Sequence, residues 1–358
     1  MTELEQRRRS VQTALAGQKV DALLVSSPAN VRYLTGYAGS NGLALVTPSE
    51  THFFTDPRYA LEASQTITCK LHIAKGPLSE AVAAIVKRKK LKKIGFEPAW
   101  LNLEQHKKLK DLLPLGASLQ PIAGVVDTLR MTKSPEEIEN IRKSVRVNSE
   151  AYARTLRRVR LGMRERDIAA ELDYQMRLHG AEKPAFDTIV AAGARTALPH
   201  AQPTGRRLEE NDLLLIDMGA CLDGYMSDMT RMAFLGQPTK RVRALYDAVL
   251  EAQMAGIEAV RPGATAARVD GAARGVLKKH GLDRQFVHST GHGLGLEIHE
   301  GPRIGKKDKT VLRAGMVITI EPGAYIDGFG GVRIEDTVLV TASGCEVLTP
   351  TTKEFVHL

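Results

Sequence analysis

A diverged internal repeat limits the fold of this 358-residue chain more than any other feature of its sequence. Residues 159–162, Val-Arg-Leu-Gly, recur as Val-Arg-Pro-Gly at 260–263, and the His-Gly pair at 179–180 recurs at 280–281. In both cases the two copies are separated by 101 residues. The pattern predicts that a helix follows each Val-Arg motif and ends at the His-Gly pair.

The repeat continues into a pair of β-hairpins. Residues 216–224, with the sequence IDMGACLDG, align with residues 320–328, IEPGAYIDG, at an offset of 104 residues. Two copies of a helix-helix-hairpin unit predict a pseudo-twofold α+β domain whose paired hairpins form one curved sheet. We expect the ligand site of such a domain to lie between the two copies.

The first part of the chain has a different pattern, in which short strands alternate with helices. Strands are predicted at 20–25, 43–47, 52–55 and 93–96, and helices at 59–64 and 78–90. This pattern indicates a smaller α/β domain. Ser134, Pro135 and Glu137 then form the capping box of a long helix. We predict an α/β domain at 1–124 and an α+β domain at 125–358.

Each hairpin of the repeat carries an acidic residue at the end of an apolar strand, Asp217 in the first copy and Glu321 in the second. Such positions are normally buried, and buried carboxylates need cations or hydrogen bonds to compensate them. A second acid follows in each hairpin, Asp228 and Glu335. A two-residue turn at 223–224 would bring Asp217 and Asp228 onto one face, with their Cβ atoms about 7 Å apart or less. One metal ion could then bridge them.

The second hairpin cannot use the same turn, because a two-residue turn at 327–328 would put Glu335 on the wrong face. A longer odd loop or a bulge is therefore predicted, and the glycines after this point allow either. Between the hairpins, glycines flank His292 and let its imidazole approach another group closely. Four carboxylates and one neutral imidazole favour hard ions such as manganese or cobalt. Two such ions ~3.5 Å apart would share a water molecule and polarise a carbonyl group.

A formal net charge of +9 raises the question of nucleic-acid binding. The basic residues fall in runs at 7–9 and 87–93, with few aromatic residues nearby to stack on bases. No helix-turn-helix, RNP or zinc-finger pattern occurs. We interpret these runs as solvated surface and expect no nucleic-acid partner.

The sequence also predicts a protein that is free in solution in a reducing compartment. No apolar stretch approaches the ~20 residues of a membrane helix, and the polar first ten residues precede no apolar signal core. Cys69, Cys221 and Cys345 lie far apart and form no CxxC pair. We therefore expect no membrane association and a cytoplasmic location.

The contexts of the acids and the histidine resemble those of the pita-bread metallopeptidases, the family of methionine aminopeptidase, aminopeptidase P and prolidase. The matching segments are IDMGACLDGYMSDMTR, HSTGHGLGLEIHE, TIEPGAY and GGVRIEDT. This resemblance covers about residues 125–358. Residues 1–124, which contain VDALLVSSPANVRYLTGY, resemble the creatinase-type N-terminal domain of the proline-specific branch, a domain that methionine aminopeptidases lack. The resemblance thus implies a pita-bread catalytic domain behind a creatinase-type domain.

The resemblance also implies roles for individual residues. The ligands of two divalent ions would be Asp217, Asp228, His292, Glu321 and Glu335, with manganese favoured and cobalt or zinc as alternatives. Glu321 would also act as general base on the water molecule that bridges the ions and attacks the substrate. His200 would steady the scissile amide, and His299 would bind the substrate or its tetrahedral intermediate. His288 would line a proline pocket, with Tyr325 and Arg333 as outer supports. Family habit implies a homodimer.

Two proline-specific activities fit these motifs. Aminopeptidase P removes any N-terminal residue that precedes proline in a peptide, whereas prolidase cleaves only Xaa-Pro dipeptides and must hold a free carboxylate. Arg303 occupies a position where prolidases carry such an arginine, but Gly301 stands where they commonly have tryptophan. We favour the aminopeptidase, acting on peptides with proline in second position, and keep prolidase as the alternative.

Two further interpretations are weaker. Some pita-bread relatives lack metals and act as binding modules for histones or RNA, and creatinase shares both domains but works without a metal. All five metal-ligand candidates are present in this chain, which argues against both.

Overall fold

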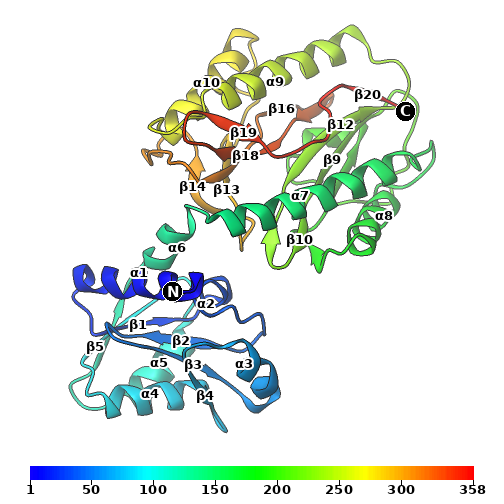
Figure 1. Cartoon of the computed structure of the whole chain (residues 1–358). Helices are drawn as coiled ribbons and strands as arrows, with labels where there is room; N and C mark the ends of the chain where they lie inside the picture. Colours follow the sequence, from blue (N-terminus) through cyan, green and yellow to red (C-terminus); the bar gives the residue numbers. More distant parts are fainter. The chain divides into compact units, whose positions relative to one another are not determined.

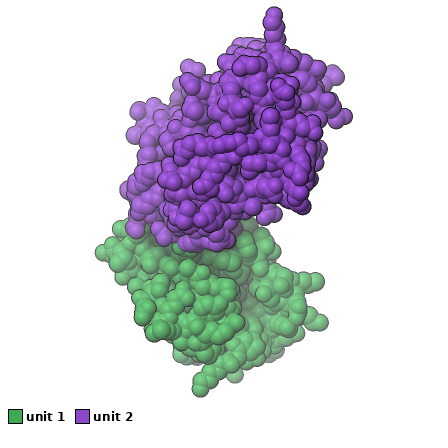
Figure 2. All heavy atoms as spheres, turned by 90° about the vertical axis from the view of Figure 1, so that its right-hand side faces the viewer, with its two compact units in different colours: residues 1–130 green, residues 131–358 purple.

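The computed structural model describes all residues from 1 to 358 and divides them into two compact units, Met1–Arg130 and Met131–Leu358 (Figure 1, Figure 2). The division falls six residues after the boundary predicted at 124 and 125. The short helix α6 (Val125–Arg130) belongs to the first unit, because the Arg130 guanidinium donates a hydrogen bond of 2.6 Å to the side-chain oxygen of Asn30.

The first unit is an α/β sheet domain, as predicted. Its six strands have the order β4-β3-β2-β1-β5-β6, in which β1 pairs antiparallel with β2 and parallel with β5. The strands are β1 (Ala22–Val25), β2 (Leu43–Val46), β3 (Thr51–Thr55), β4 (Lys70–Ile73), β5 (Lys93–Phe96) and β6 (Ser118–Pro121). The other helices are α1 (Glu3–Gln18), α2 (Pro28–Thr35), α3 (Ala60–Thr66), α4 (Leu78–Arg88) and α5 (Leu103–Leu112). The four strands and two helices predicted from the pattern are thus confirmed.

The basic run at 7–9 is not a wholly solvated face, and the prediction was wrong for its middle residue. Arg8 is buried in α1, where its guanidinium donates hydrogen bonds to the backbone oxygen of Leu34 and to the hydroxyl of Thr68, both at 3.1 Å. A buried guanidinium that bonds within its own domain contributes to folding rather than to a binding surface.

The second unit confirms the repeated helix-helix-hairpin pattern. Its helices form two packed pairs, α7 (Pro135–Leu156) with α8 (Glu165–Leu178) and α9 (Lys240–Glu258) with α10 (Ala266–Lys279). Figure 1 shows α7 with α8, and α9 with α10, as two such pairs beside the strands. The strands of the first copy are β7 (Lys183–Pro184), β8 (Ile189–Ala192), β9 (Leu213–Met218), β10 (Ala220–Leu222), β11 (Tyr225–Met226) and β12 (Met229–Phe234). Those of the second are β13 (Gly291–Gly293), β14 (Glu300–Ile304), β15 (Val317–Ile320), β16 (Gly323–Ile326), β17 (Gly330–Arg333), β18 (Asp336–Val340) and β19 (Cys345–Val347), followed by β20 (Val356–His357).

The prediction of one curved sheet needs correction. The strands form a four-stranded sheet, β20-β12-β9-β8, and a five-stranded sheet, β14-β13-β15-β18-β19, with the hairpin tips β10-β11 and β16-β17 in separate ladders. The ladders break at Gly219 in the first copy and at Glu321 and Pro322 in the second. Proline has no N–H group to donate, so a strand ladder is easily interrupted there.

The core of the second unit lies between the helices and these sheets. All six residues of β9 are buried, and Leu214 and Ile216 pack with Ile168 and Leu172 of α8. Leu215, on the other face of β9, packs in a second cluster with α9. The strand that carries Asp217 is therefore covered on both faces, which fixes its position.

No helix in the chain has both the length and the apolar character that a membrane crossing requires.

Replacing Ser134 by alanine should lower the free energy of unfolding of the second unit by about 1 kcal/mol, because its hydroxyl accepts the Glu137 N–H at the start of α7. Calorimetric unfolding measures the change. Ser149→Ala, in the same helix, is the control, because the Ser149 hydroxyl has no hydrogen-bond partner. Equal destabilisation by the two substitutions would contradict the capping role.

Candidate metal centre and active site

The first hairpin has the predicted turn. Leu222 pairs with Tyr225, so residues 223 and 224 form a two-residue loop, and both have positive φ angles, 49° at Asp223 and 77° at Gly224. This is the backbone of a type I′ turn, which Asp-Gly favours. The same register pairs Asp217 of β9 with Thr230 of β12 and leaves Asp228 immediately before β12.

The second hairpin has the odd loop that the sequence predicted. Ile326 pairs with Gly330, which leaves a three-residue loop at 327–329. The register is the same on both sides of the break in the ladder, since Gly323 pairs with Arg333 and Ile320 pairs with Asp336. Extended across the break, this register sets Glu321 opposite Glu335. The loop length therefore decides that these two acids face each other.

His292 reaches the acids from β13 because both of its neighbours are glycines. A Cβ atom at Gly291 would lie 1.9 Å from the backbone oxygen of Thr319, and one at Gly293 would lie 2.1 Å from that of Gly301. No other residue type is tolerated at such distances. The predicted role of these glycines is confirmed.

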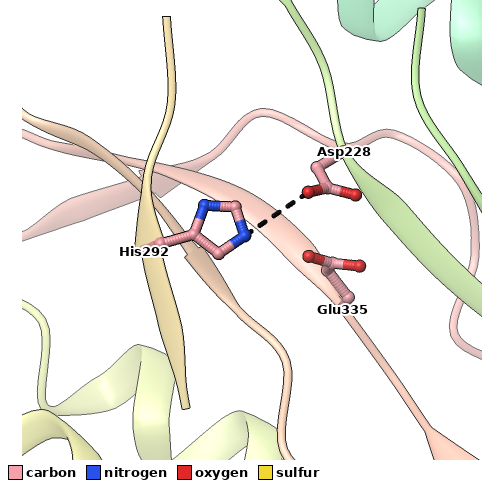
Figure 3. Close-up of side chains that lie close together, drawn as sticks. All are labelled: Asp228, His292 and Glu335. Atoms are coloured by element: carbon pink, nitrogen blue, oxygen red, sulfur yellow. Dashed lines mark ion pairs between the residues drawn. The ribbon is translucent and has the colours of Figure 1, made fainter. Parts of the chain in front are cut away.

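The side chains converge in a small cluster (Figure 3). Asp228, His292 and Glu335 each offer a potential ligand atom, and these atoms all lie within 4.8 Å of one another. The His292 Nε2 atom is 3.6 Å from Asp228 Oδ2 and 3.4 Å from Glu321 Oε1. The two halves of the repeat thus bring an imidazole and three carboxylates to one point.

The fifth candidate, Asp217, lines the same cavity and bonds to the one cation in direct contact with the acids. Its Oδ2 atom accepts a hydrogen bond of 2.5 Å from Arg333, while its buried Oδ1 atom has no hydrogen-bond partner. An oxygen that is buried without a partner is costly, unless a cation binds there.

Burial and mutual repulsion change the protonation of these acids. Burial, followed by repulsion from neighbouring carboxylates, raises the pKa of Asp228 and of Glu335 well above the usual values. Burial raises the pKa of Glu321 to about 7. A single arginine does not compensate the negative charge of these acids. The cluster of acids therefore attracts further positive charge.

The donor set suits divalent metal ions. Burial lowers the pKa of His292 to about 4, so its imidazole is neutral near pH 7. The Nδ1 atom lies 3.0 Å from the backbone oxygen of Gly293, which can only accept a hydrogen bond. The lone pair of Nε2 is therefore directed at the carboxylates, an arrangement that a cation between them would stabilise.

The cluster lines a cavity of about 580 Å³ in the second unit. His200, His288, His299 and Arg303, four further residues predicted from the sequence, line this cavity together with Arg333. The rings of His292 and His299 meet edge to face with centroids 4.5 Å apart. Burial lowers the pKa of His299 and takes that of His288 to about 4.

Tyr325 lies behind the cavity wall rather than in its lining. Its hydroxyl is 2.9 Å from His288 Nε2 and accepts a hydrogen bond of 2.8 Å from Arg333. Tyr325 therefore contacts two residues of the cavity lining, His288 and Arg333, without lining the cavity itself.

Two threonines that the sequence analysis missed hold the acids in place. Thr230 donates a hydrogen bond of 2.7 Å to Glu335 Oε2, and the Thr319 hydroxyl lies 3.3 Å from Glu321 Oε1. Thr230 follows Asp228 by two positions, and Thr319 precedes Glu321 by two. Because side chains alternate along a strand, this spacing is the signal that could have identified them.

Added Mn²⁺ should raise the melting temperature of the protein more at about pH 8 than at about pH 5.5. The pKa of Glu321 is raised from 4.5 to about 7 by folding, so between these values the folded metal-free protein holds an extra proton and its stability falls as pH rises. Metal binding needs the ionised carboxylates, and an ion at ~100 times its Kd adds about 2.7 kcal/mol.

Calorimetry with chelator and with Mn²⁺ at both pH values measures this difference. Asp228→Asn should remove most of the gain at pH 8, whereas Asp223→Asn, at the exposed hairpin turn, is the matched control. A gain of equal size at both pH values, or one that survives in Asp228→Asn, would contradict a metal centre formed by these acids.

Comparison with known proteins assigns the family. Residues 139–342 match the model of metallopeptidase family M24, and residues 7–132 match the creatinase/prolidase N-terminal domain. A Xaa-Pro dipeptidase of Pyrococcus furiosus is 40% identical over 337 residues, which cover 94% of this chain and 95% of that protein. The structure of a Xaa-Pro dipeptidase from Bacillus anthracis superposes with a TM-score of 0.97 at 35% identity, covering 99% of this chain and all of that one. An X-Pro aminopeptidase from Thermotoga maritima gives 0.90 at 34% identity, with 97% and 99% covered. These matches extend over both units, and the chain belongs to the metallopeptidase family M24, in its proline-specific branch with a creatinase-type N-terminal domain.

Proposed function

We propose that this protein is a metal-dependent Xaa-Pro dipeptidase, which hydrolyses the bond between a first residue and a C-terminal proline. Relatives and structural neighbours that are named Xaa-Pro dipeptidase or prolidase support this activity over the aminopeptidase P activity that we favoured from the sequence. The single observation that carries the proposal is Arg303, an arginine in the cavity lining whose guanidinium has no partner.

Arg303 has the chemistry needed to hold the carboxylate of a dipeptide. The other arginine of the cavity, Arg333, is already bonded to Asp217, to Tyr325 and to the backbone oxygen of Pro199. Arg303 has no side-chain hydrogen bond or ion pair, and it pairs across the strands with His292. A guanidinium binds a carboxylate through two parallel hydrogen bonds. Arg303 can therefore select substrates in which proline carries the free C-terminal carboxylate.

Five side chains would hold two divalent ions, namely Asp217, Asp228, His292, Glu321 and Glu335. The bound ions supply Lewis-acid chemistry, which polarises the scissile carbonyl group and makes water more acidic. Four carboxylates favour manganese, with cobalt or zinc as alternatives. The stoichiometry of two and the identity of the metal stay predictions that metal analysis of the purified protein can test.

Glu321 is the group that we assign to proton transfer. Its carboxylate lines the cavity beside the other acids, where it can accept a proton from the attacking water and return it to the proline nitrogen as that nitrogen leaves. His200 and His299 line the cavity beside the cluster, where an imidazole N–H can donate a hydrogen bond to the carbonyl oxygen as negative charge develops on it.

His288 would form one wall of the proline pocket. Its Nδ1 atom is 2.8 Å from the backbone oxygen of Ser289, and its Nε2 atom is 2.9 Å from the Tyr325 hydroxyl. With both nitrogens engaged, the ring offers its carbon edge and faces to a ligand. These surfaces suit the apolar ring of proline, which has no N–H group to donate once it is part of a peptide bond.

An X-Pro aminopeptidase is the second candidate, because the neighbour from Thermotoga maritima carries that name at a similar level of identity. An aminopeptidase accepts chains that continue past proline, so it would not depend on a cation that binds the carboxylate of proline.

The homodimer and the cytoplasmic location implied by the sequence stay predictions. Light scattering on the metal-loaded protein tests the homodimer.

With Mn²⁺ or Co²⁺ supplied, the protein should cleave Gly-Pro and should cleave Arg-Pro-Pro far more slowly. Arg303→Ala should lower kcat/KM for Gly-Pro about tenfold to a hundredfold, mainly through KM, because it removes a charged hydrogen-bond partner worth about 1.5–3 kcal/mol. Initial rates of release of the first residue, glycine from Gly-Pro and arginine from Arg-Pro-Pro, measure both effects.

Arg313→Ala is the matched control, because Arg313 is exposed and outside the cavity lining. Efficient cleavage of Arg-Pro-Pro by the unaltered protein, with equal rates in Arg303→Ala and Arg313→Ala, would replace the dipeptidase with the aminopeptidase. No cleavage of either peptide in the presence of metal would refute both activities.

A further inference from the structure

The cavity contains one acidic side chain that has neither a partner nor a role described above. Six carboxylates line it: Asp187, Asp217, Asp228, Glu300, Glu321 and Glu335. Four of these are metal-ligand candidates, and Glu300 is paired with Lys133 at 3.1 Å. Asp187 alone is exposed and has neither a hydrogen bond nor an ion pair. It is therefore the acidic counterpart of Arg303, the one unpaired arginine of the lining.

A bulge in the strand pairing brings Asp187 to the cavity. Pro184 pairs with Ala220 and Ile189 pairs with Asp217, so the four residues 185–188 lie opposite only two, 218 and 219. The Ala185 N–H still donates to the backbone oxygen of Gly219 at 2.7 Å, which leaves the three residues 186–188 opposite Met218 alone. Bulges of this kind redirect side chains next to active sites.

The neighbours of Asp187 in the bulge support this orientation. Thr188 is buried and donates a hydrogen bond of 2.5 Å to Asp173 of α8, away from the cavity. Phe186 and Ile189 line the cavity together with Asp187. The bulge therefore presents an apolar wall with one carboxylate at its exposed edge.

The internal repeat relates Asp187 to His288, which we assign to the proline pocket. Ile189 pairs with Asp217, and in the second copy Thr290 accepts a hydrogen bond of 2.7 Å from the N–H of Glu321, the counterpart of Asp217. Two residues before Ile189 and Thr290 stand Asp187 and His288, 101 residues apart, the same offset that relates the helix ends. The two side chains thus occupy equivalent positions on opposite halves of the domain.

We propose that Asp187 binds the basic side chain of a lysine or arginine that precedes proline in the substrate, and so selects for Lys-Pro and Arg-Pro. This inference rests on the proposed function. If proline lies against His288 and its carboxylate on Arg303, the first residue lies on the other half of the domain. The Asp187 Cα atom is at most about 7 Å along the chain from that of Ile189, opposite Asp217, so a long flexible side chain at the reaction centre can reach it.

The α-ammonium group of the substrate is a different cation that Asp187 could meet, and the experiment separates the two. Every dipeptide carries that ammonium group, whereas only some carry a basic side chain. A contact with the ammonium group changes all substrates equally. A contact with the side chain changes the ratio between Lys-Pro and Met-Pro, whose first residues have similar length but differ in charge.

The test compares kcat/KM for Lys-Pro, Met-Pro and Glu-Pro in the manganese-loaded full chain. Asp187→Asn should lower the ratio of kcat/KM for Lys-Pro to that for Met-Pro about threefold to fivefold, as the removal of an exposed ion pair does. The change should appear in KM. Asp187→Lys should make Glu-Pro a better substrate than Lys-Pro. The preference of the unaltered protein for Lys-Pro should also weaken at high salt, because exposed charges are screened.

Asp283→Asn, an exposed carboxylate outside the cavity lining, is the control and should keep the ratio of the unaltered protein. Ratios that stay the same in Asp187→Asn and Asp187→Lys, or an equal loss for all three peptides, would overturn the proposal. If the unaltered protein cleaves no dipeptide, the proposed function fails. The same peptides then serve as ligands in calorimetric titrations, and the ratio of their Kd values decides the role of Asp187 in the same way.

Discussion

Repulsion among buried carboxylates is the constraint on which the rest of this structure depends. Asp228, Glu321 and Glu335 lie around one imidazole, and burial, followed by repulsion from neighbouring carboxylates, raises the pKa of each of them. Arg333 offsets only part of this charge, and Asp217 keeps an oxygen without a partner. The fold must therefore hold the acids against their own repulsion, and strands covered on both faces by helices and core residues can do this.

The pseudo-twofold repeat explains how one cavity acquires different chemistry on its two sides. Each half supplies a hairpin with two acids, so the metal-ligand candidates are nearly symmetric. The symmetry ends in the rest of the lining, where one half contributes Asp187 and the other His288 and Arg303. A substrate with unlike ends needs such an asymmetric lining, and different residues at equivalent positions of a duplicated unit provide it without a new fold.

A chain of hydrogen bonds links the proline pocket to the acids. His288 contacts the Tyr325 hydroxyl, which accepts from Arg333, which in turn donates to Asp217. Arg333 also donates to the Thr230 hydroxyl, which holds Glu335. A change at His288 can therefore alter the position of a metal-ligand candidate without touching it, since buried networks of this kind respond as a unit.

The sequence by itself determined the repeat, the helix start at Ser134, the turn at 223–224 and the acids with His292, because each depends on local backbone preference or on the two-residue period of a strand. It did not determine the breaks in the sheet, the burial of Arg8, the bulge at 185–188 or which charged side chains in the cavity lack partners. Those features depend on which distant segments meet. Pairing between strands far apart in sequence is decided by the packing of the whole domain, and only the tertiary structure carries that information.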